Sequence, residues 1–164
     1  MKVSIGIDPG YRTGIVAWDG EAGKIVEIKT VDREEAMKEI RVTAAKFARD
    51  LVCFGVEVPA TKHTYYRPGT NVRAMRKIAH NVGDCYRVAM DLVQFCLAVW
   101  PEITTYAMPP GRTKTSRAIF EYLTGYPQEK RSSSHSRDAG RIAQRAYNKW
   151  AYNNLIEEVA GDDA

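Results

Sequence analysis

The order of apolar and polar positions along the chain predicts its secondary structure. Three short apolar runs, 2–8, 13–18 and 24–31, are separated by turn-forming Pro, Gly and Asp residues, which predicts three strands in an antiparallel meander. A helix is expected from about 32 to 50, because Ala36, Ile40 and Ala44 recur at helical spacing. Asp32 is expected to cap this helix.

The second half of the chain alternates strands with helices. Residues 51–58 are nearly all apolar, which predicts a strand buried on both faces, with Glu57 as its one charged side chain. The remaining elements are expected as a long helix over about 71–100, a strand over 103–108, and helices over about 113–124 and 135–159.

The resulting order, β-β-β-α-β-α-β-α, predicts the fold class. We expect one mixed α/β domain over residues 1–164, with a five-stranded sheet flanked by helices. Residues 157–164 are expected to form an acidic, flexible tail. The long helix over 71–100 is apolar nearly all round from Val88 onward, so we expect it to be covered on more than one side.

The amino-acid composition indicates the class of protein and the compartment in which we expect it. A hydrophobic fraction of 45% and a charged fraction of 27% are typical of an ordinary globular domain. No apolar run approaches membrane-spanning length, and the three cysteines lack metal-site spacing, so we expect free thiols, a cytoplasmic location and no membrane partner.

The charge distribution indicates the kind of partner. The net charge is only +4, but 58–83 and 103–120 contain no acid and several Lys and Arg residues. Such segregation favours a basic face that binds a polyanion, with nucleic acid as the first candidate. Scattered, solvated surface cations are the alternative.

Acidic side chains stand where the predicted elements would bring them together. Asp8 and Glu57 close two buried strands, and His135 and Asp138 share one face of the last helix at i, i+3 spacing. Since ligand sites in α/β sheets lie at the carboxyl ends of strands, we expect these four residues at one edge of the sheet.

Each member of this group also has a plainer interpretation. Asp8 alone fits a Pro-Gly turn, and His135 with Asp138 fits a polar first helical turn. As a group, crowded carboxylates need cations to offset their repulsion, and oxygen ligands suit Mg²⁺ or Mn²⁺. Two such ions, about 3.5–4 Å apart, would activate a water molecule and stabilise a leaving oxygen at a phosphodiester.

These residues resemble a known family. IGIDPGYRTG, Glu57, the long helix after it and HSRDAGRIA are similar to the RuvC-type Holliday junction resolvases of the RNase H-like superfamily. The resemblance spans roughly residues 3–151. It implies an RNase H-like fold, with Asp8, Glu57 and Asp138 as ligands of two Mg²⁺ ions, and His135 as a further ligand or as the group that orients the water.

The resemblance also implies the substrate and the assembly. The family's members are homodimers that nick two opposed strands of a four-way junction, leaving 5′-phosphate and 3′-hydroxyl ends, and the implied dimer contact is the helix over 71–100. The loops YYRPGT and LTGYPQEKRSSS depart from the usual bacterial pattern. They indicate a divergent member and leave a phage origin and strict junction selectivity open.

Candidate DNA contacts follow the basic windows. They are basic or aromatic residues near the predicted sheet edge: Arg12, Tyr65, Tyr66, Arg73, Arg76, Lys77, Lys114, Lys130 and Arg131. The two tyrosines could stack on bases or anchor a loop. A stripe on the last helix is either a phosphate track or a solvated face, and consists of Arg137, Arg141, Arg145 and Lys149.

Two other classes of function compete with a nuclease. GIDPGYRTG also resembles the first phosphate loop of actin-like and sugar-kinase ATPases, but those proteins need two such domains and 164 residues supply one. A non-catalytic branched-DNA binder is the other alternative. Clustered acids facing phosphate would be of no benefit to such a binder.

Overall fold

The computed structural model describes residues 1–59, 71–111, 116–126 and 132–161. Its strands are β1 (Val3–Asp8), β2 (Arg12–Asp19), β3 (Lys24–Asp32), β4 (Leu51–Glu57) and β5 (Thr104–Met108). Its helices are the 3₁₀ turn η1 (Arg33–Glu35), α1 (Ala36–Lys46), α2 (Val72–Val99), α3 (Arg117–Thr124) and α4 (Ser134–Gly161).

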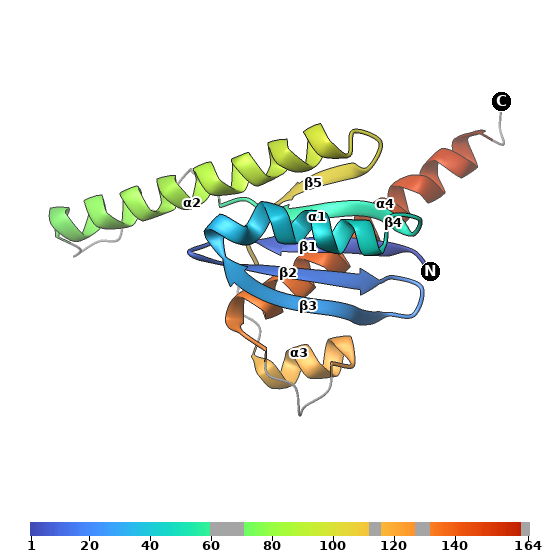
Figure 1. Ribbon diagram of the computed structural model, residues 1–164, viewed down its shortest axis with the longest axis horizontal. Coiled ribbons are helices and arrows are strands. Elements are labelled where there is room, and N and C mark those ends of the chain that lie inside the picture. Colours follow the sequence, from blue (N-terminus) through green and yellow to red (C-terminus); the bar gives the residue numbers. More distant parts are fainter. Residues whose placement is uncertain (60–70, 112–115, 127–131, 162–164) are drawn as a thin grey trace.

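The five strands form one mixed sheet in the order β3-β2-β1-β4-β5 (Figure 1). β1, β2 and β3 pair antiparallel, whereas β4 runs parallel to both β1 and β5. This arrangement confirms the predicted mixed α/β fold, with three antiparallel strands followed by two parallel ones in a five-stranded sheet. Ile7 pairs with Val56, so the next residues, Asp8 and Glu57, end neighbouring parallel strands at the same edge.

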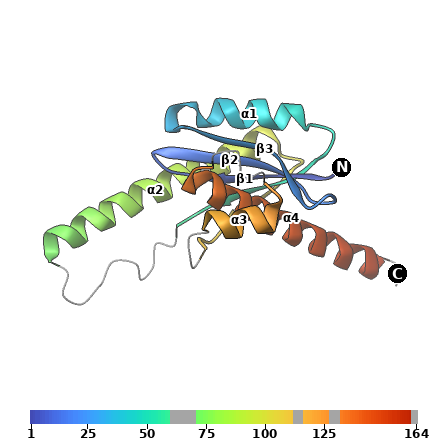
Figure 2. The same ribbon diagram turned by 90° about the horizontal axis from the view of Figure 1, so that it is seen from below.

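The two faces of the sheet are covered by different helices. Ile5 and Ile7 belong to a core cluster with Ile40 of α1 and Leu92 of α2. On the opposite face the hydroxyl group of Ser4 donates to the carbonyl of Ala143 in α4. Figure 2 shows α1 above the sheet and α3 and α4 beneath it. Because side chains alternate along a strand, Asp8 projects to the α4 face, as Ser4 does.

Two glycines let α4 pack directly on the strands. A Cβ atom on Gly6 would overlap the carbonyl oxygen of Ala139, and one on Gly14 would overlap the carbonyl oxygen of His135. The backbone of the sheet therefore contacts the backbone of α4. This close approach places the first turns of α4 over the C-terminal end of β1 and the N-terminal end of β2.

Side-chain capping marks the start of α2 but not that of the first helical segment. Asn71 precedes α2, and its side chain accepts a hydrogen bond from the backbone N–H of Ala74 at 2.8 Å. Asp32, the expected cap of the first helix, makes no side-chain capping bond. That expectation was wrong, because the 3₁₀ turn η1 comes between Asp32 and α1.

Both long helices continue past the sheet (Figure 1). The buried side chains of α2 lie in its second half, from Val88 to Cys96, whereas its first half projects away from the sheet. α4 continues to Gly161, so residues 157–161 of the expected tail are helical, and 162–164 lie outside the described residues. Among the described helices, none has the length and apolar character needed to cross a membrane.

The cysteines are free thiols, as the sequence predicts. Cys53 and Cys96 are buried and Cys85 is partly buried. Burial raises the pKa of the Cys53 and Cys96 thiols to about 12, so both are protonated at neutral pH.

Candidate functional site

The four predicted site residues come to one edge of the sheet from three elements. Asp8 ends β1, Glu57 ends β4, and His135 and Asp138 lie in the first turns of α4. The Nδ1 atom of His135 lies 2.8 Å from Oδ2 of Asp8. This contact joins the end of the central strand, β1, to the start of α4, which packs on that strand.

Glu57 is affected by both aspartates. Burial, followed by the negative charges of Asp8 and Asp138, raises the pKa of Glu57 from 4.5 to about 7. Arg145 and a hydrogen bond from the backbone N–H of Gly111 act in the opposite direction and only partly offset this rise. Glu57 therefore lies close enough to both aspartates for their charges to disfavour its ionised form.

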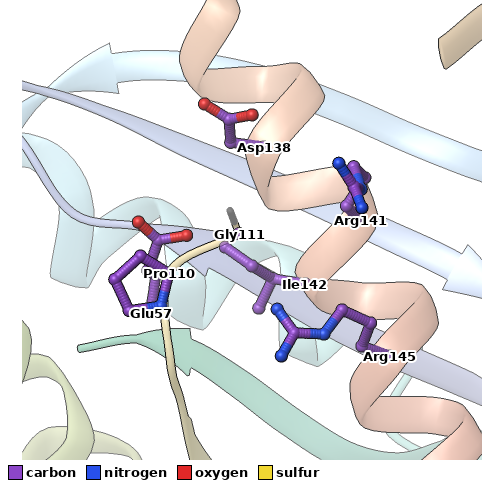
Figure 3. Close-up of a pocket in the computed structure, with 7 residues that line it drawn as sticks. All are labelled: Glu57, Pro110, Gly111, Asp138, Arg141, Ile142 and Arg145. Atoms are coloured by element: carbon purple, nitrogen blue, oxygen red, sulfur yellow. The ribbon is translucent and has the colours of Figure 1, made fainter. Parts of the chain in front are cut away.

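Glu57 and Asp138 face a common pocket of about 210 Å³ (Figure 3). Its walls come from the end of β4, from the segment after β5 and from one face of α4. The lining residues are Glu57, Pro110, Gly111, Asp138, Arg141, Ile142 and Arg145.

The chemistry of these donors fits a hard divalent cation. Three carboxylates and one imidazole are oxygen and nitrogen ligands that suit Mg²⁺ or Mn²⁺. Burial and the charges of Asp8 and Asp138 raise the pKa of Glu57 more than Arg145 lowers it, and a bound cation would favour the ionised carboxylate. Within the described residues, however, no group of three or more His, Cys, Asp or Glu side chains is arranged as a metal site. Asp8 is instead paired with His135.

Sequence reasoning did not assign two arginines to the pocket. From the sequence, Arg141 and Arg145 are two of the four cations in the stripe on α4, which was interpreted either as a phosphate track or as a solvated face. The structure places these two beside Glu57 and Asp138. Their spacing of three and seven residues from Asp138 is the signal that could have found them, since such residues share one helical face.

The other predicted DNA contacts lie away from this pocket or outside the described residues. The exposed Arg12 lies 3.4 Å from Asp32, measured from Nε to Oδ1. Arg73, Arg76 and Lys77 are exposed in the first turns of α2, on its projecting half (Figure 1). Five candidates lie outside the described residues, namely Tyr65, Tyr66, Lys114, Lys130 and Arg131.

Comparison with known proteins gives structural neighbours alone. No protein-family model matches the chain, and no curated protein matches it. Among solved structures, RuvC of T. thermophilus in complex with a Holliday junction substrate is 18% identical, with a TM-score of 0.48, and the match covers 88% of this chain and 91% of that one. A propionate kinase from Francisella tularensis subsp. tularensis SCHU S4 is 9% identical, with a TM-score of 0.47, over 74% of this chain and 38% of the kinase.

Proposed function

We propose that this protein is a Mg²⁺-dependent endonuclease that hydrolyses a phosphodiester of branched DNA, with the four-way junction as its substrate. One observation carries the proposal: Asp8, Glu57 and Asp138 come to one sheet edge, and two arginines line a pocket together with Glu57 and Asp138. Acids in mutual repulsion are destabilising on their own, so their grouping favours a role in binding cations. The products would be 5′-phosphate and 3′-hydroxyl ends.

Each residue of the site has a role in this proposal. Asp8, Glu57 and Asp138 would hold two Mg²⁺ ions, for which Mn²⁺ could substitute. When bound, such ions supply an activated water and stabilise the leaving oxygen. His135 is oriented by Asp8, and its second ring nitrogen would accept the proton of the attacking water.

The DNA would be held by cations on the same side of the molecule. Arg12 follows the turn after Asp8, and Arg73, Arg76 and Lys77 are exposed at the start of α2. Phosphate contacts from such side chains position a nucleic acid without reading its sequence. Tyr65, Tyr66, Lys114, Lys130 and Arg131 complete the proposed DNA-binding set.

A homodimer through α2 would allow paired, symmetric nicks. Tyr86, Met90 and Leu97 lie along one side of this helix, and Tyr86 and Leu97 are 36% and 42% exposed. Apolar side chains left exposed on a helix that already covers the sheet are typical of a subunit contact.

The test is a cleavage assay on three labelled substrates, namely a four-way junction, a flap and a linear duplex, with Mg²⁺ or with EDTA. We expect the wild-type protein to cut the junction with Mg²⁺ only, and Asp8→Asn and Asp138→Asn to abolish cutting. Glu102→Gln is the matched control, since Glu102 is exposed and lies away from the pocket.

Two results would count against parts of the proposal. Cutting that survives both EDTA and Asp8→Asn would exclude the mechanism, and equal cutting of all three substrates would exclude junction selectivity. Binding without any cutting, unchanged or tightened by Asp8→Asn, would indicate the non-catalytic DNA binder instead.

A further inference from the structure

We propose that Arg141 and Arg145 form a phosphate-binding subsite that holds the backbone phosphates next to the one that is cut. The inference rests on the proposed nuclease function and assigns these two residues a role within it. They would position the DNA strand and would not take part in bond breaking.

The helix places both arginines in line with Asp138. The three residues are spaced i, i+3 and i+7, so they share one face of α4, and Figure 3 shows them one after another along that helix. Ile142 forms an apolar part of the wall between them. Because a helix rises about 1.5 Å per residue, Arg141 and Arg145 stand about 4.5 and 10.5 Å along the axis from Asp138.

This spacing is of the same order as the distances between neighbouring phosphates of a nucleic-acid strand. Phosphates of one strand of a duplex follow each other at about 3.4 Å along its axis. A phosphodiester held near Asp138 would therefore have its neighbours within reach of Arg141 and then of Arg145. A guanidinium group is planar and presents its N–H donors in a fork that matches two oxygens of a phosphate.

The arginines could instead serve only to neutralise the acids of the pocket. Nη1 of Arg145, however, donates to the neutral carbonyl oxygen of Pro109 at 3.1 Å. That contact fixes the guanidinium group at the pocket wall with one of its five N–H donors. Arg145 is therefore held in place by the backbone and not by ion pairing with Glu57.

Arg137 and Lys149, the outer members of the basic stripe, make contacts outside the pocket, so one of them can serve as a control for the loss of a charge. Arg137 donates to the carbonyl of Ser132 at 2.9 Å, and the Lys149 ammonium lies 4.8 Å from the centre of the Tyr106 ring. Neither residue lines the pocket. The stripe therefore consists of two arginines in the pocket beside the acids and two cations outside it. Lys149→Ala removes one positive charge, as Arg141→Ala and Arg145→Ala do, but outside the pocket.

The experiment measures binding of a fluorescent four-way junction in EDTA over a series of salt concentrations. We expect Arg141→Ala and Arg145→Ala each to weaken binding about tenfold and to reduce the slope of log K against log[salt] by about 0.7–0.9, the value for one lost phosphate contact. Lys149→Ala should change the slope by much less. Arg145→Lys should restore the slope, since the charge returns, but only part of the affinity.

Melting temperatures show whether a variant is folded, and cleavage by the wild type shows whether the proposed nuclease function holds independently of the subsite. If Arg145→Ala does not fold, the test relies on Arg141→Ala and Arg145→Lys. An unchanged slope in the Arg141 and Arg145 variants, or an equal change in Lys149→Ala, would overturn the subsite while wild-type cutting upholds the nuclease. Absence of both binding and cutting by the wild type would overturn the proposed function and the subsite together.

Discussion

His135 Nδ1 lies 2.8 Å from Oδ2 of Asp8, and this pair links the first turn of α4 to the end of β1. The Asp8 side chain is 10% exposed and that of His135 is 40% exposed. With Asp8 ionised and the imidazole neutral, the contact places the ring proton on Nδ1 and the lone pair on Nε2. In the proposed mechanism Asp8 thereby orients His135 as a base, in addition to its proposed role toward a cation.

His135→Ala should lower the rate of junction cutting by about 10²–10⁴-fold, because the proton of the attacking water would lose its acceptor. Junction binding in EDTA should change little. The control is His80→Ala, since His80 is 77% exposed on α2 and pairs only with Asp84 among the described residues. Equal losses of cutting in both variants would argue against a role for His135.

Glu57→Gln should change how stability depends on pH in metal-free protein. The pKa of Glu57 is raised from 4.5 to about 7 in the folded state, so the protonated form stabilises the fold below about 4.5 and this contribution is lost as the pH rises through 7. Glutamine keeps the neutral form at every pH. We expect Glu57→Gln to gain about 1–2 kcal/mol over the wild type between pH 5 and pH 8.5, a value reduced for solvent screening of this half-buried side chain.

Urea unfolding at the two pH values measures this difference. Glu102→Gln, at an exposed position, should follow the wild type at both. A Glu57→Gln protein whose advantage is the same at pH 5 and pH 8.5 would show that the pKa of Glu57 is not raised in the folded protein.

Mg²⁺ should raise the melting temperature of the wild-type protein at pH 8 above that in KCl of equal ionic strength. A cation at about 100 times its Kd stabilises a fold by ~2.7 kcal/mol, which corresponds to several degrees for a domain of this size. Asp8→Asn and Asp138→Asn should lose this rise, whereas Glu102→Gln should keep it. A rise that survives both aspartate substitutions would place the cation elsewhere.

Gly6→Ala should destabilise the protein by about 2–3 kcal/mol, because the new methyl group would overlap the carbonyl oxygen of Ala139 and push α4 from the sheet. Cutting should fall as well, since α4 carries His135 and Asp138. The control is Gly83→Ala, where a Cβ atom meets no described atom within 4 Å. There, in the interior of α2, we expect a gain of about 0.5–1 kcal/mol. Calorimetry that gives both substitutions the same sign would contradict this packing.

Leu97→Glu should convert the proposed dimer to a monomer. Leu97 is 42% exposed on α2, so the monomer tolerates a charge there, whereas an apolar subunit contact would not. Light scattering should show the mass of one chain in place of two, with an unchanged circular dichroism spectrum. Leu155→Glu on the exposed part of α4 is the control and should leave the assembly intact.

Much of the site follows from local sequence. Asp8 and Glu57 each close an apolar strand, and two parallel strands of similar length bring such ends to one edge. His135 and Asp138 share a helical face because of their spacing. Hydrophobic periodicity likewise predicts the elements and their order, since it records which side of each element is buried.

Tertiary structure alone decided which side chains meet. Spacing grouped His135 with Asp138, but the backbone contact at Gly14 positions the first turn of α4 so that His135 pairs with Asp8. Spacing also left the four cations of the α4 stripe equivalent, whereas packing against the segment after β5 places Arg141 and Arg145 in the pocket. Sequence periodicity defines a face of each element, but the distance and rotation between two packed elements depend on how closely their backbones approach. Here two small residues on the sheet set that approach.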